Sequence, residues 1–260
     1  MRIALTQMDQ KWENKKENLL TCEVLINEAK NHGVDLIIFP EMTLTGFSMN
    51  YPAVAEEKES KNLEKFKKLA QSNDIAIIFG LVIKNEKYGT NSAIFLSREG
   101  EVLGTYNKIH PFSIAGEDEN IKGGELLCVV ENLNLRIGIT ICYDLRFPEL
   151  YSALSQHCDL VVNIANWPAK RQDHWFSLIK ARSIENQIYV AGINRTGIDG
   201  KSIEYKKSSL LVNPNGDIVR PLLENEDFAI YEIDQNMVGE FRDSFSTVQD
   251  RRPNLYKSLL

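Results

Sequence analysis

Short apolar segments that alternate with helical patterns restrict the fold of this chain more than any other feature. Asp35–Pro40 and Ile75–Val82 are too short and too uniformly apolar to be anything but buried strands. Lys15–Asn31 and Ser60–Ser72 instead place their apolar residues at helical spacing. Because helices recur between strands with no internal repeat or linker, the pattern predicts one α/β domain over residues 1–260, built from layers of helix and sheet.

The same alternation continues through the rest of the chain. Thr90–Leu96 and Val102–Tyr106 are predicted to pair as a hairpin, joined by a turn at Arg98-Glu99-Gly100. Further strands are expected at Arg2–Gln7, Arg136–Ile141, Leu160–Asn163, Tyr189–Asn194, Ser208–Val212, Ile218–Arg220 and Ala229–Ile233, and further helices at Pro148–Gln156 and Asp173–Asn186.

Composition excludes several classes of protein. The chain has 260 residues, 43% hydrophobic and 25% charged, which is typical of a soluble globular protein with a large core. Its net charge of −6 argues against a nucleic acid or an anionic membrane as a partner. No apolar stretch approaches the ~20 residues that cross a bilayer, and the chain opens directly into a strand. Four cysteines without a Cys-x-x-Cys pair indicate free thiols in a reducing cytoplasm.

Cys142 lies where a predicted strand gives way to a predicted helix. The strand Arg136–Ile141 runs directly into Cys142, and Pro148 with Glu149 suits the first turn of a helix. A thiol on such a sharp turn has backbone N–H groups beside it, which can stabilise an oxyanion when the thiolate attacks a carbonyl. Cys142 is therefore a candidate nucleophile, although a lone cysteine is more often a small buried apolar residue.

Two charged residues at other strand ends strengthen this interpretation. Glu41 follows the apolar strand and Pro40, and Lys108 ends the strand from Val102. The carboxyl ends of strands are the usual location of sites in open α/β sheets. A partly buried Glu can take the thiol proton, a Lys can hold the developing oxyanion, and the Cys can attack. We therefore expect the three side chains to meet in one site.

These segments resemble the three catalytic motifs of the nitrilase, or carbon–nitrogen hydrolase, superfamily. The motifs are Phe39-Pro-Glu41, Tyr106-Asn-Lys-Ile-His-Pro111 and Ile141-Cys-Tyr-Asp-Leu-Arg-Phe-Pro-Glu149, in the family's order and approximate spacing. The resemblance implies a four-layer αββα sandwich of the nitrilase type. It also implies a homodimer or higher homo-oligomer, with the segment of about 234–260 as a tail packed on the domain or on its partner.

The resemblance also implies a role for each residue. Glu41 would be the general base, Lys108 the oxyanion stabiliser and Cys142 the nucleophile that hydrolyses an amide through a thioester. Family members carry a second glutamate between the Lys and Cys motifs. Glu117 fits it best here, and Glu119 is an alternative. No metal or other cofactor is expected.

Three further motifs resemble the omega-amidase branch and its bacterial relatives, namely Asn166-Trp-Pro-Ala169, His174-Trp175 and Ala181-Arg-Ser-Ile-Glu-Asn-Gln187. This branch favours a small dicarboxylate monoamide, such as 2-oxoglutaramate or 2-oxosuccinamate, as the substrate. The candidate substrate-binding residues are Tyr143, Arg146, Phe112, Trp167, Arg171 and His174. One departure from the branch is Ser208-Ser209, where close relatives tend to carry an acidic residue before the serine.

Other interpretations stay open at this point. The same triad serves N-carbamoyl amine or amino-acid amidohydrolases and aliphatic nitrilases, and the fold can also carry a catalytically silent binding protein. Arg146 has an alternative structural role, paired with Asp144 or Glu149. A Cys–His enzyme would need an imidazole base, yet a histidine before proline, such as His110, is more often a structural hydrogen-bonding residue.

Overall fold

Two β-sheets packed face to face form the centre of the computed structural model, which describes residues 1–259. The first sheet contains β1 (Arg2–Thr6), β2 (Leu36–Ile38), β3 (Ala55–Glu56), β4 (Ala76–Lys84), β5 (Gly89–Leu96), β6 (Val102–Asn107), β14 (Leu223–Glu224) and β15 (Phe228–Glu232). The second contains β7 (Val129–Asn132), β8 (Leu135–Ile141), β9 (Leu160–Ala165), β10 (Tyr189–Asn194) and β13 (Leu210–Val212).

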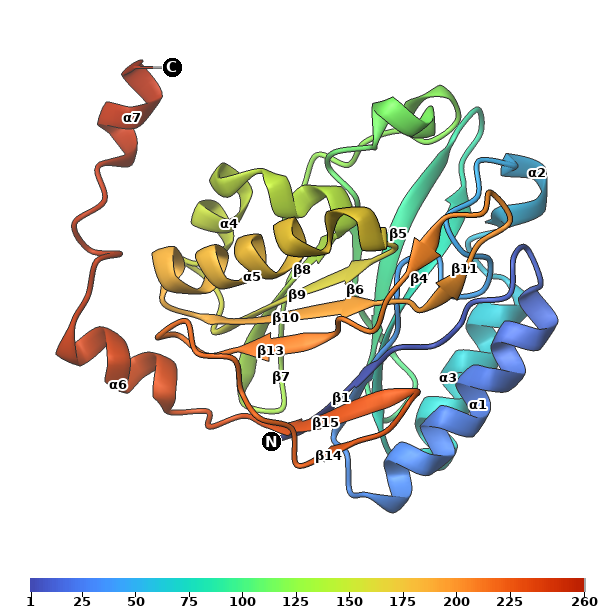
Figure 1. The fold of residues 1–260 in the computed structure, drawn as a ribbon, viewed down its shortest axis with the longest axis horizontal. Coiled ribbons are helices and arrows are strands. Elements are labelled where there is room, and N and C mark those ends of the chain that lie inside the picture. The colour runs from blue at the N-terminus through green and yellow to red at the C-terminus, as the bar shows by residue number, and fades with distance from the viewer. Residues whose placement is uncertain (260) are drawn as a thin grey trace.

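Helices cover the outer faces of both sheets (Figure 1). On the first sheet lie α1 (Lys15–Asn31) and α3 (Lys61–Asn73), and on the second lie α4 (Pro148–Leu154) and α5 (Gln172–Asn186). This order of layers confirms the predicted αββα sandwich. Within residues 1–259, no helix combines the length and the apolar character needed to cross a membrane.

The period of two along each strand divides the core into two parts. In β1 and β2, Ile3 and Leu36 face the second sheet, whereas Ala4 and Ile37 face the helices α1 and α3. All four side chains are fully buried. A strand that must fill both cores has no solvent-facing side, which explains why these segments are uniformly apolar in the sequence.

Strand directions bring several chain segments to one edge of the sandwich. The strands β1, β2 and β4 are parallel, and β6 runs the same way because it pairs antiparallel to β5, which pairs antiparallel to β4. In the second sheet β8, β9 and β10 are also parallel. The residues that follow β2, β6, β8 and β9 are therefore able to converge on one site.

The predicted elements agree with the structure except in short segments. The hairpin of β5 and β6 and the other predicted strands of the two sheets lie within about two residues of their predicted bounds. The strand predicted at Ile218–Arg220 is wrong, because only Ile218 forms an isolated bridge, to Val212. Pro221, which follows directly, has no N–H to continue a strand ladder.

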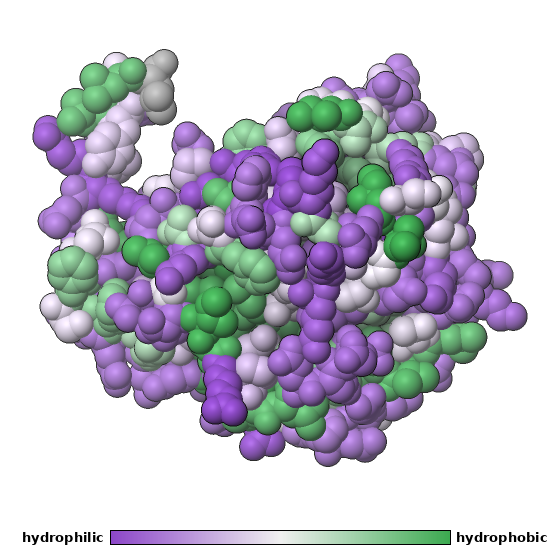
Figure 2. Space-filling model, viewed as in Figure 1, coloured by the Kyte–Doolittle hydropathy of each residue, from purple (hydrophilic) through white to green (hydrophobic). Residues whose placement is uncertain are grey.

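Several short elements have too little periodicity to be predicted. They include the strands β3, β7 and β14, α2 (Tyr51–Val54), the hairpin of β11 (Gly197–Ile198) and β12 (Glu204–Tyr205), and the C-terminal helices α6 (Met237–Ser244) and α7 (Pro253–Leu259). Among these, α6 packs on the body through the buried Val238. By contrast, α7 stands away from the body (Figure 1) and has hydrophobic side chains near its end (Figure 2).

Candidate active site

Cys142 lies at the junction between a strand and a helical turn. β8 ends at Ile141, and the 3₁₀-helix η3 (Cys142–Arg146) begins at the cysteine itself. The backbone of Cys142 has a φ of 45°, in the left-handed region that is unfavourable for a residue with a side chain. The carboxylate of Asp144 holds this turn, since it accepts hydrogen bonds from the backbone N–H of Ile141 at 3.0 Å and from the hydroxyl of Tyr106 at 2.8 Å. The thiol therefore stands on a strained turn that its neighbours fix.

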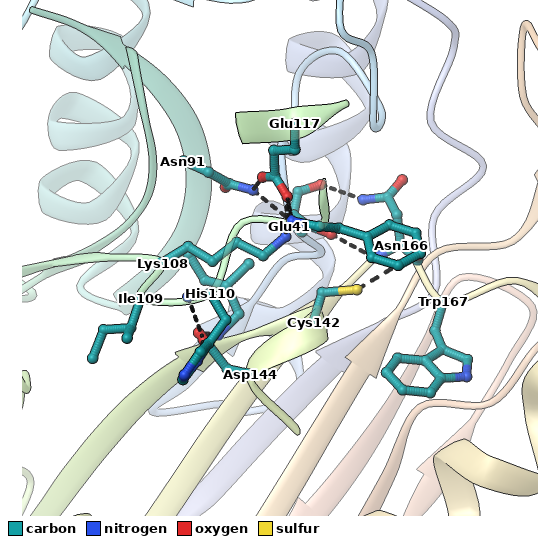
Figure 3. Close-up of polar contacts among 12 residues, drawn as sticks. Glu41, Asn91, Lys108, Ile109, His110, Glu117, Cys142, Asp144, Asn166 and Trp167 are labelled. Atoms are coloured by element: carbon teal, nitrogen blue, oxygen red, sulfur yellow. Dashed lines mark hydrogen bonds and ion pairs between the residues drawn. The ribbon is translucent and has the colours of Figure 1, made fainter. Parts of the chain in front are cut away.

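Glu41 lies just past the end of β2, and its side chain is fully buried (Figure 3). Its Oε1 accepts hydrogen bonds from Lys108 Nζ at 2.9 Å and from Asn91 Nδ2 at 2.7 Å, and its Oε2 accepts one from the backbone N–H of Asn166 at 3.0 Å. Gly80 on β4 makes room for this loop, because a Cβ there would lie 2.6 Å from a backbone nitrogen of the loop. Both carboxylate oxygens are thus held in place without solvent.

Lys108 follows β6 and is also buried, with its ammonium between two carboxylates. Its Nζ donates to Glu41 Oε1 at 2.9 Å and to Glu117 Oε2 at 2.8 Å. The same Glu117 oxygen accepts a 2.6 Å hydrogen bond from the backbone N–H of Phe112. Glu117 is fully buried whereas Glu119 is exposed, so the structure brings Glu117, and not Glu119, into the cluster.

Burial and mutual charge set the protonation of this cluster. Two carboxylates share one ammonium, so Glu41, Glu117 and Lys108 carry one excess negative charge when all are ionised. Burial raises the pKa of Glu41, with Lys108 opposing and Glu117 adding to the rise. Burial alone would lower the pKa of Lys108, but the two carboxylates raise it above its ordinary value. Burial and the charge of Glu41 raise the pKa of Cys142 well above its ordinary value, so the resting side chain is a neutral thiol.

A cavity of about 420 Å³ opens beside the thiol. Of the six candidate substrate-binding residues, Tyr143, Arg146, Phe112, Trp167 and Arg171 line this cavity. Two of the cations lie over aromatic rings, with Arg146 Cζ 4.8 Å from the Trp167 ring centre and Arg171 Cζ 5.9 Å from that of Phe112. Arg146 forms no ion pair with Asp144 or Glu149 in the described chain, so its predicted structural alternative is wrong. Within residues 1–259 its guanidinium has no carboxylate partner, so it can bind an anion.

Two histidines take structural positions. His174 is exposed on α5 and does not line the cavity, so the structure does not place it with the other five candidate substrate-binding residues. Its Nδ1 lies 3.4 Å from Arg146 Nη2, so its influence on the cavity would pass through that arginine. His110 bonds Asp144 through Nδ1 at 2.7 Å and stacks on Phe147, as expected of a structural histidine.

Three features of the site were not predicted, namely the contacts of Asn91 and of Asn166 with Glu41 and the hairpin of β11 and β12. Asn91, in the middle of β5, donates to Glu41 at 2.7 Å and to Glu117 at 2.8 Å. Asn166 follows β9 as Glu41 follows β2, and this strand-end position is a signal that would have found it. The hairpin of β11 and β12 adds Asp199, Lys201, Ile203 and Tyr205 to the cavity wall. Within residues 1–259, no three His, Cys, Asp or Glu side chains are grouped to hold a metal ion.

A sequence profile decides the family of this chain. The carbon–nitrogen hydrolase profile matches residues 2–243, which include every residue of the cluster. The chain belongs to the carbon–nitrogen hydrolase family. The chain is thus a hydrolase that acts on carbon–nitrogen bonds, and its buried cluster of Glu41, Lys108 and Glu117 lies beside the cavity that Lys108 and Cys142 line.

Two curated relatives of this carbon–nitrogen hydrolase are named as amidases. The chain is 34% identical to the omega-amidase YafV of Escherichia coli strain K12, over 96% of each chain, and 29% identical to the 2-oxoglutaramate amidase of Bacillus subtilis strain 168, over 98% of each. The crystal structure of XC1258 from Xanthomonas campestris, a CN-hydrolase superfamily protein with an arsenic adduct in its active site, is similar with a TM-score of 0.90. That comparison has 28% identity and covers 97% of both chains.

Proposed function

We propose that this carbon–nitrogen hydrolase is an omega-amidase, which hydrolyses the terminal amide of a small 2-oxo dicarboxylate monoamide. 2-Oxoglutaramate and 2-oxosuccinamate are the substrates that we favour. The observation that carries the proposal is a buried Glu–Lys–Cys cluster beside a cavity that also contains the free cations of Arg146 and Arg171. The names of the E. coli and B. subtilis relatives support the same class of substrate.

In the proposed reaction, Cys142 Sγ attacks the amide carbon while Glu41 takes the thiol proton. The raised pKa of the thiol makes such a base necessary, and the raised pKa of Glu41 makes its carboxylate a better one. Lys108 and the backbone N–H groups at the strained turn stabilise the oxyanion. Its collapse breaks the C–N bond, and Glu41 returns the proton to the leaving group, which departs as ammonia.

Water completes the proposed cycle. Glu41 takes a proton from a water molecule, whose oxygen attacks the thioester carbon and releases the carboxylic acid. The proton returns to sulfur, so that the net reaction is amide plus water giving carboxylic acid plus ammonia. Glu117 would act as a positioning residue here, because it holds Lys108 Nζ at 2.8 Å and shares the Asn91 amide with Glu41.

The cavity fits a short acidic amide better than a long or polymeric substrate. Its volume of about 420 Å³ is in the lower part of the usual range for small-molecule sites. Phe112, Tyr143 and Trp167 would contact the methylene groups. Arg146 and Arg171 would bind the distal carboxylate, for which a planar guanidinium offers paired donors.

An ammonia-release screen tests the proposal. Purified enzyme is supplied with ω-amides of 2-oxo acids, glutamine, asparagine, carbamoyl amines, simple amides and nitriles. We expect the highest kcat/KM for the 2-oxo ω-amides and no turnover by Cys142→Ala, with an acyl adduct on Cys142 in quenched wild-type enzyme. Preference for carbamoyl amines or nitriles would move the assignment to those branches. An inert Cys142 with no turnover of any compound would favour a binding protein.

We also propose that residues 1–260 fold as one domain and that the tail of about 234–260 reaches a second copy in a homodimer. Arg242 anchors the first part of the tail, since its Nη2 donates to the carbonyls of Ser155 and Asn186 at 3.0 Å each. The helix α7 stands clear of the body (Figure 1). Its Tyr256 is 48% exposed, so the ring is available for contact with a second copy. Light scattering is expected to find a dimer in the wild type and a weaker one in Tyr256→Asp. A monomeric wild type would contradict this proposal.

The four thiols support a reducing compartment, which we propose is the cytoplasm. Cys22, Cys128, Cys142 and Cys158 are all unpaired in the structure. Fractionation of cells that express the native protein, with thiol labelling before and after reduction, tests this proposal. Oxidised thiols in freshly lysed cells would contradict it.

A further inference from the structure

The hairpin of residues 197–205 forms a wall of the cavity that the catalytic motifs do not explain. Gly197 pairs with Tyr205 and Ile198 with Glu204, and the loop between the strands carries Lys201. The cavity-lining residues of this hairpin are Asp199, Lys201, Ile203 and Tyr205. A short hairpin that supplies so much of a cavity wall can select among substrates.

Hydrogen bonds within the hairpin fix its shape. Asp199 Oδ1 accepts from the backbone N–H groups of Lys201 at 2.8 Å and Ile203 at 2.9 Å, and Oδ2 accepts from the Tyr205 hydroxyl at 3.0 Å. Asp199 as a whole is only 7% exposed. The hydrogen bonds that its carboxylate accepts therefore lie within the turn, where they orient the backbone of Lys201.

The base of the hairpin is held by the body of the protein. The guanidinium of the buried Arg195 lies 4.7 Å from the centre of the Tyr205 ring, and its Nη2 donates to the carbonyl of Gln10 at 3.0 Å. On the other side Gly200 packs directly on Trp12, because a Cβ at Gly200 would lie 2.5 Å from the indole. The hairpin thus packs against the body on both sides, which fixes the backbone position of Lys201.

The side chain of Lys201 is free to bind a ligand. Within residues 1–259 its ammonium has no ion pair or hydrogen bond, and the residue is exposed where it lines the cavity. The strand β12 packs against the 3₁₀-helix η4 (Ala169–Arg171), which carries Arg171. Lys201 and Arg171, which belong to separate elements, both line this cavity.

We propose that Lys201 is a specificity residue that binds the distal carboxylate of an acidic amide, together with Arg146 and Arg171. This proposal rests on the proposed omega-amidase function and deepens it, since it assigns a part of the charge selection to the hairpin. A lysine suits this place because its ammonium is a compact charge on a flexible stem, which can follow carboxylates at different distances from the amide. Ile203, beside it, offers an apolar contact for the methylene groups.

A matched pair of probes tests Lys201 without using the chemistry of Cys142. 2-Oxopentanoate has the 2-oxo carboxylate but no amide, and pentan-2-one lacks the charge. Affinities are obtained from the rise of Tm with probe concentration, for wild type, Lys201→Met and Lys206→Met. Lys206 is the control because it is an exposed lysine just after the same hairpin and does not line the cavity.

We expect the wild type to prefer the anion and Lys201→Met to bind it roughly 2- to 5-fold more weakly, the effect of one solvent-exposed charge contact. Pentan-2-one should lose less than about twofold, so the selectivity falls, and Lys206→Met should keep the wild-type selectivity. Added salt should weaken anion binding more in wild type than in Lys201→Met. Lys201→Arg should restore most of the selectivity.

Several outcomes would overturn the proposal. They are a wild type without anion preference, an equal loss in Lys201→Met and Lys206→Met, and an equal loss for both probes in Lys201→Met. The proposed function fails separately, if the wild type releases no ammonia from any 2-oxo ω-amide. In that event a selective effect of Lys201→Met would still assign an anion site to the hairpin.

Discussion

Removal of the Lys108 ammonium tests the charge balance of the buried cluster most directly. In Lys108→Met an uncharged side chain of similar length replaces the ammonium, and Glu41 and Glu117 then share a buried site without a cation. Removing one partner of a buried ion pair costs roughly 3–5 kcal/mol. In a domain of this size each kcal/mol lowers Tm by about 2–4 °C, so we expect a fall of roughly 6–20 °C near neutral pH.

The pH dependence separates charge from packing. Without Lys108 the two carboxylates repel each other, which raises the pKa of one of them in the folded protein above its unfolded value. A group with a raised folded pKa contributes stability below its unfolded pKa and loses it as the pH rises through the folded pKa. The Tm deficit of Lys108→Met should therefore be large near about pH 8 and shrink towards about pH 5. Calorimetry at several pH values measures it, with the exposed Lys206→Met as control.

Activity provides a second measurement on the same variant. Loss of an oxyanion-stabilising cation should lower kcat by ~10²-fold or more at a temperature where the variant is folded. A Tm deficit that stays constant from about pH 5 to 8 would indicate lost packing and not an unpaired charge. A variant as stable as the wild type at pH 8 would refute the reasoning about the buried charges.

Three further variants test the other side chains of the site. Glu41→Gln keeps the shape and removes the excess negative charge, so kinetics and calorimetry should find turnover lowered by ~10²-fold or more and Tm within about 3 °C of wild type; near-normal turnover would require another base. Asn91→Leu removes a donor that lowers the pKa of Glu41, so this pKa rises further and the acidic limb of the kcat/KM profile should move to higher pH; an unmoved limb would exclude Glu41 as its source. Arg146→Lys should lower kcat/KM for 2-oxoglutaramate by about 30- to 150-fold but only slightly for butyramide. Equal losses with a lower Tm would give Arg146 a structural role.

The layers of the fold follow from the sequence because the central strands are buried on both faces. Leu36–Ile38 has no solvent-facing side, so its uniform apolar character and short length leave few alternatives to a strand. The hairpin of β11 and β12 has strands of two residues each, which is too short for any period to appear. Its shape depends instead on Asp199 and on the contact of Gly200 with Trp12, which is nearly 190 residues away in sequence.

The Glu, Lys and Cys of the candidate site could be predicted because each residue follows the end of a strand. Glu41, Lys108 and Cys142 each occupy such a position, and parallel strands bring these ends to one edge. Asn91 has no such signal, because it lies inside a strand and its role depends on β5 lying between β4 and β6. The place of His174 outside the cavity lining could not be predicted, since the position of a residue in a helical sequence does not reveal how α5 is rotated against the cavity.

The neutral thiol of Cys142 leads to a final prediction about its reactivity. The charge of Glu41 both raises the pKa of the thiol and supplies the base that removes its proton, so Glu41→Gln has opposite effects at different pH. Near neutral pH the variant lacks the base, and alkylation of Cys142 by iodoacetamide should slow. In alkaline solution the thiol ionises by itself, and its pKa is lower without the neighbouring carboxylate, so the variant should react as fast as the wild type or faster. The two rate profiles, followed by mass spectrometry of the Cys142 adduct, should therefore cross. A variant that reacts faster at every pH would mean that Glu41 only opposes the thiolate and is not its base.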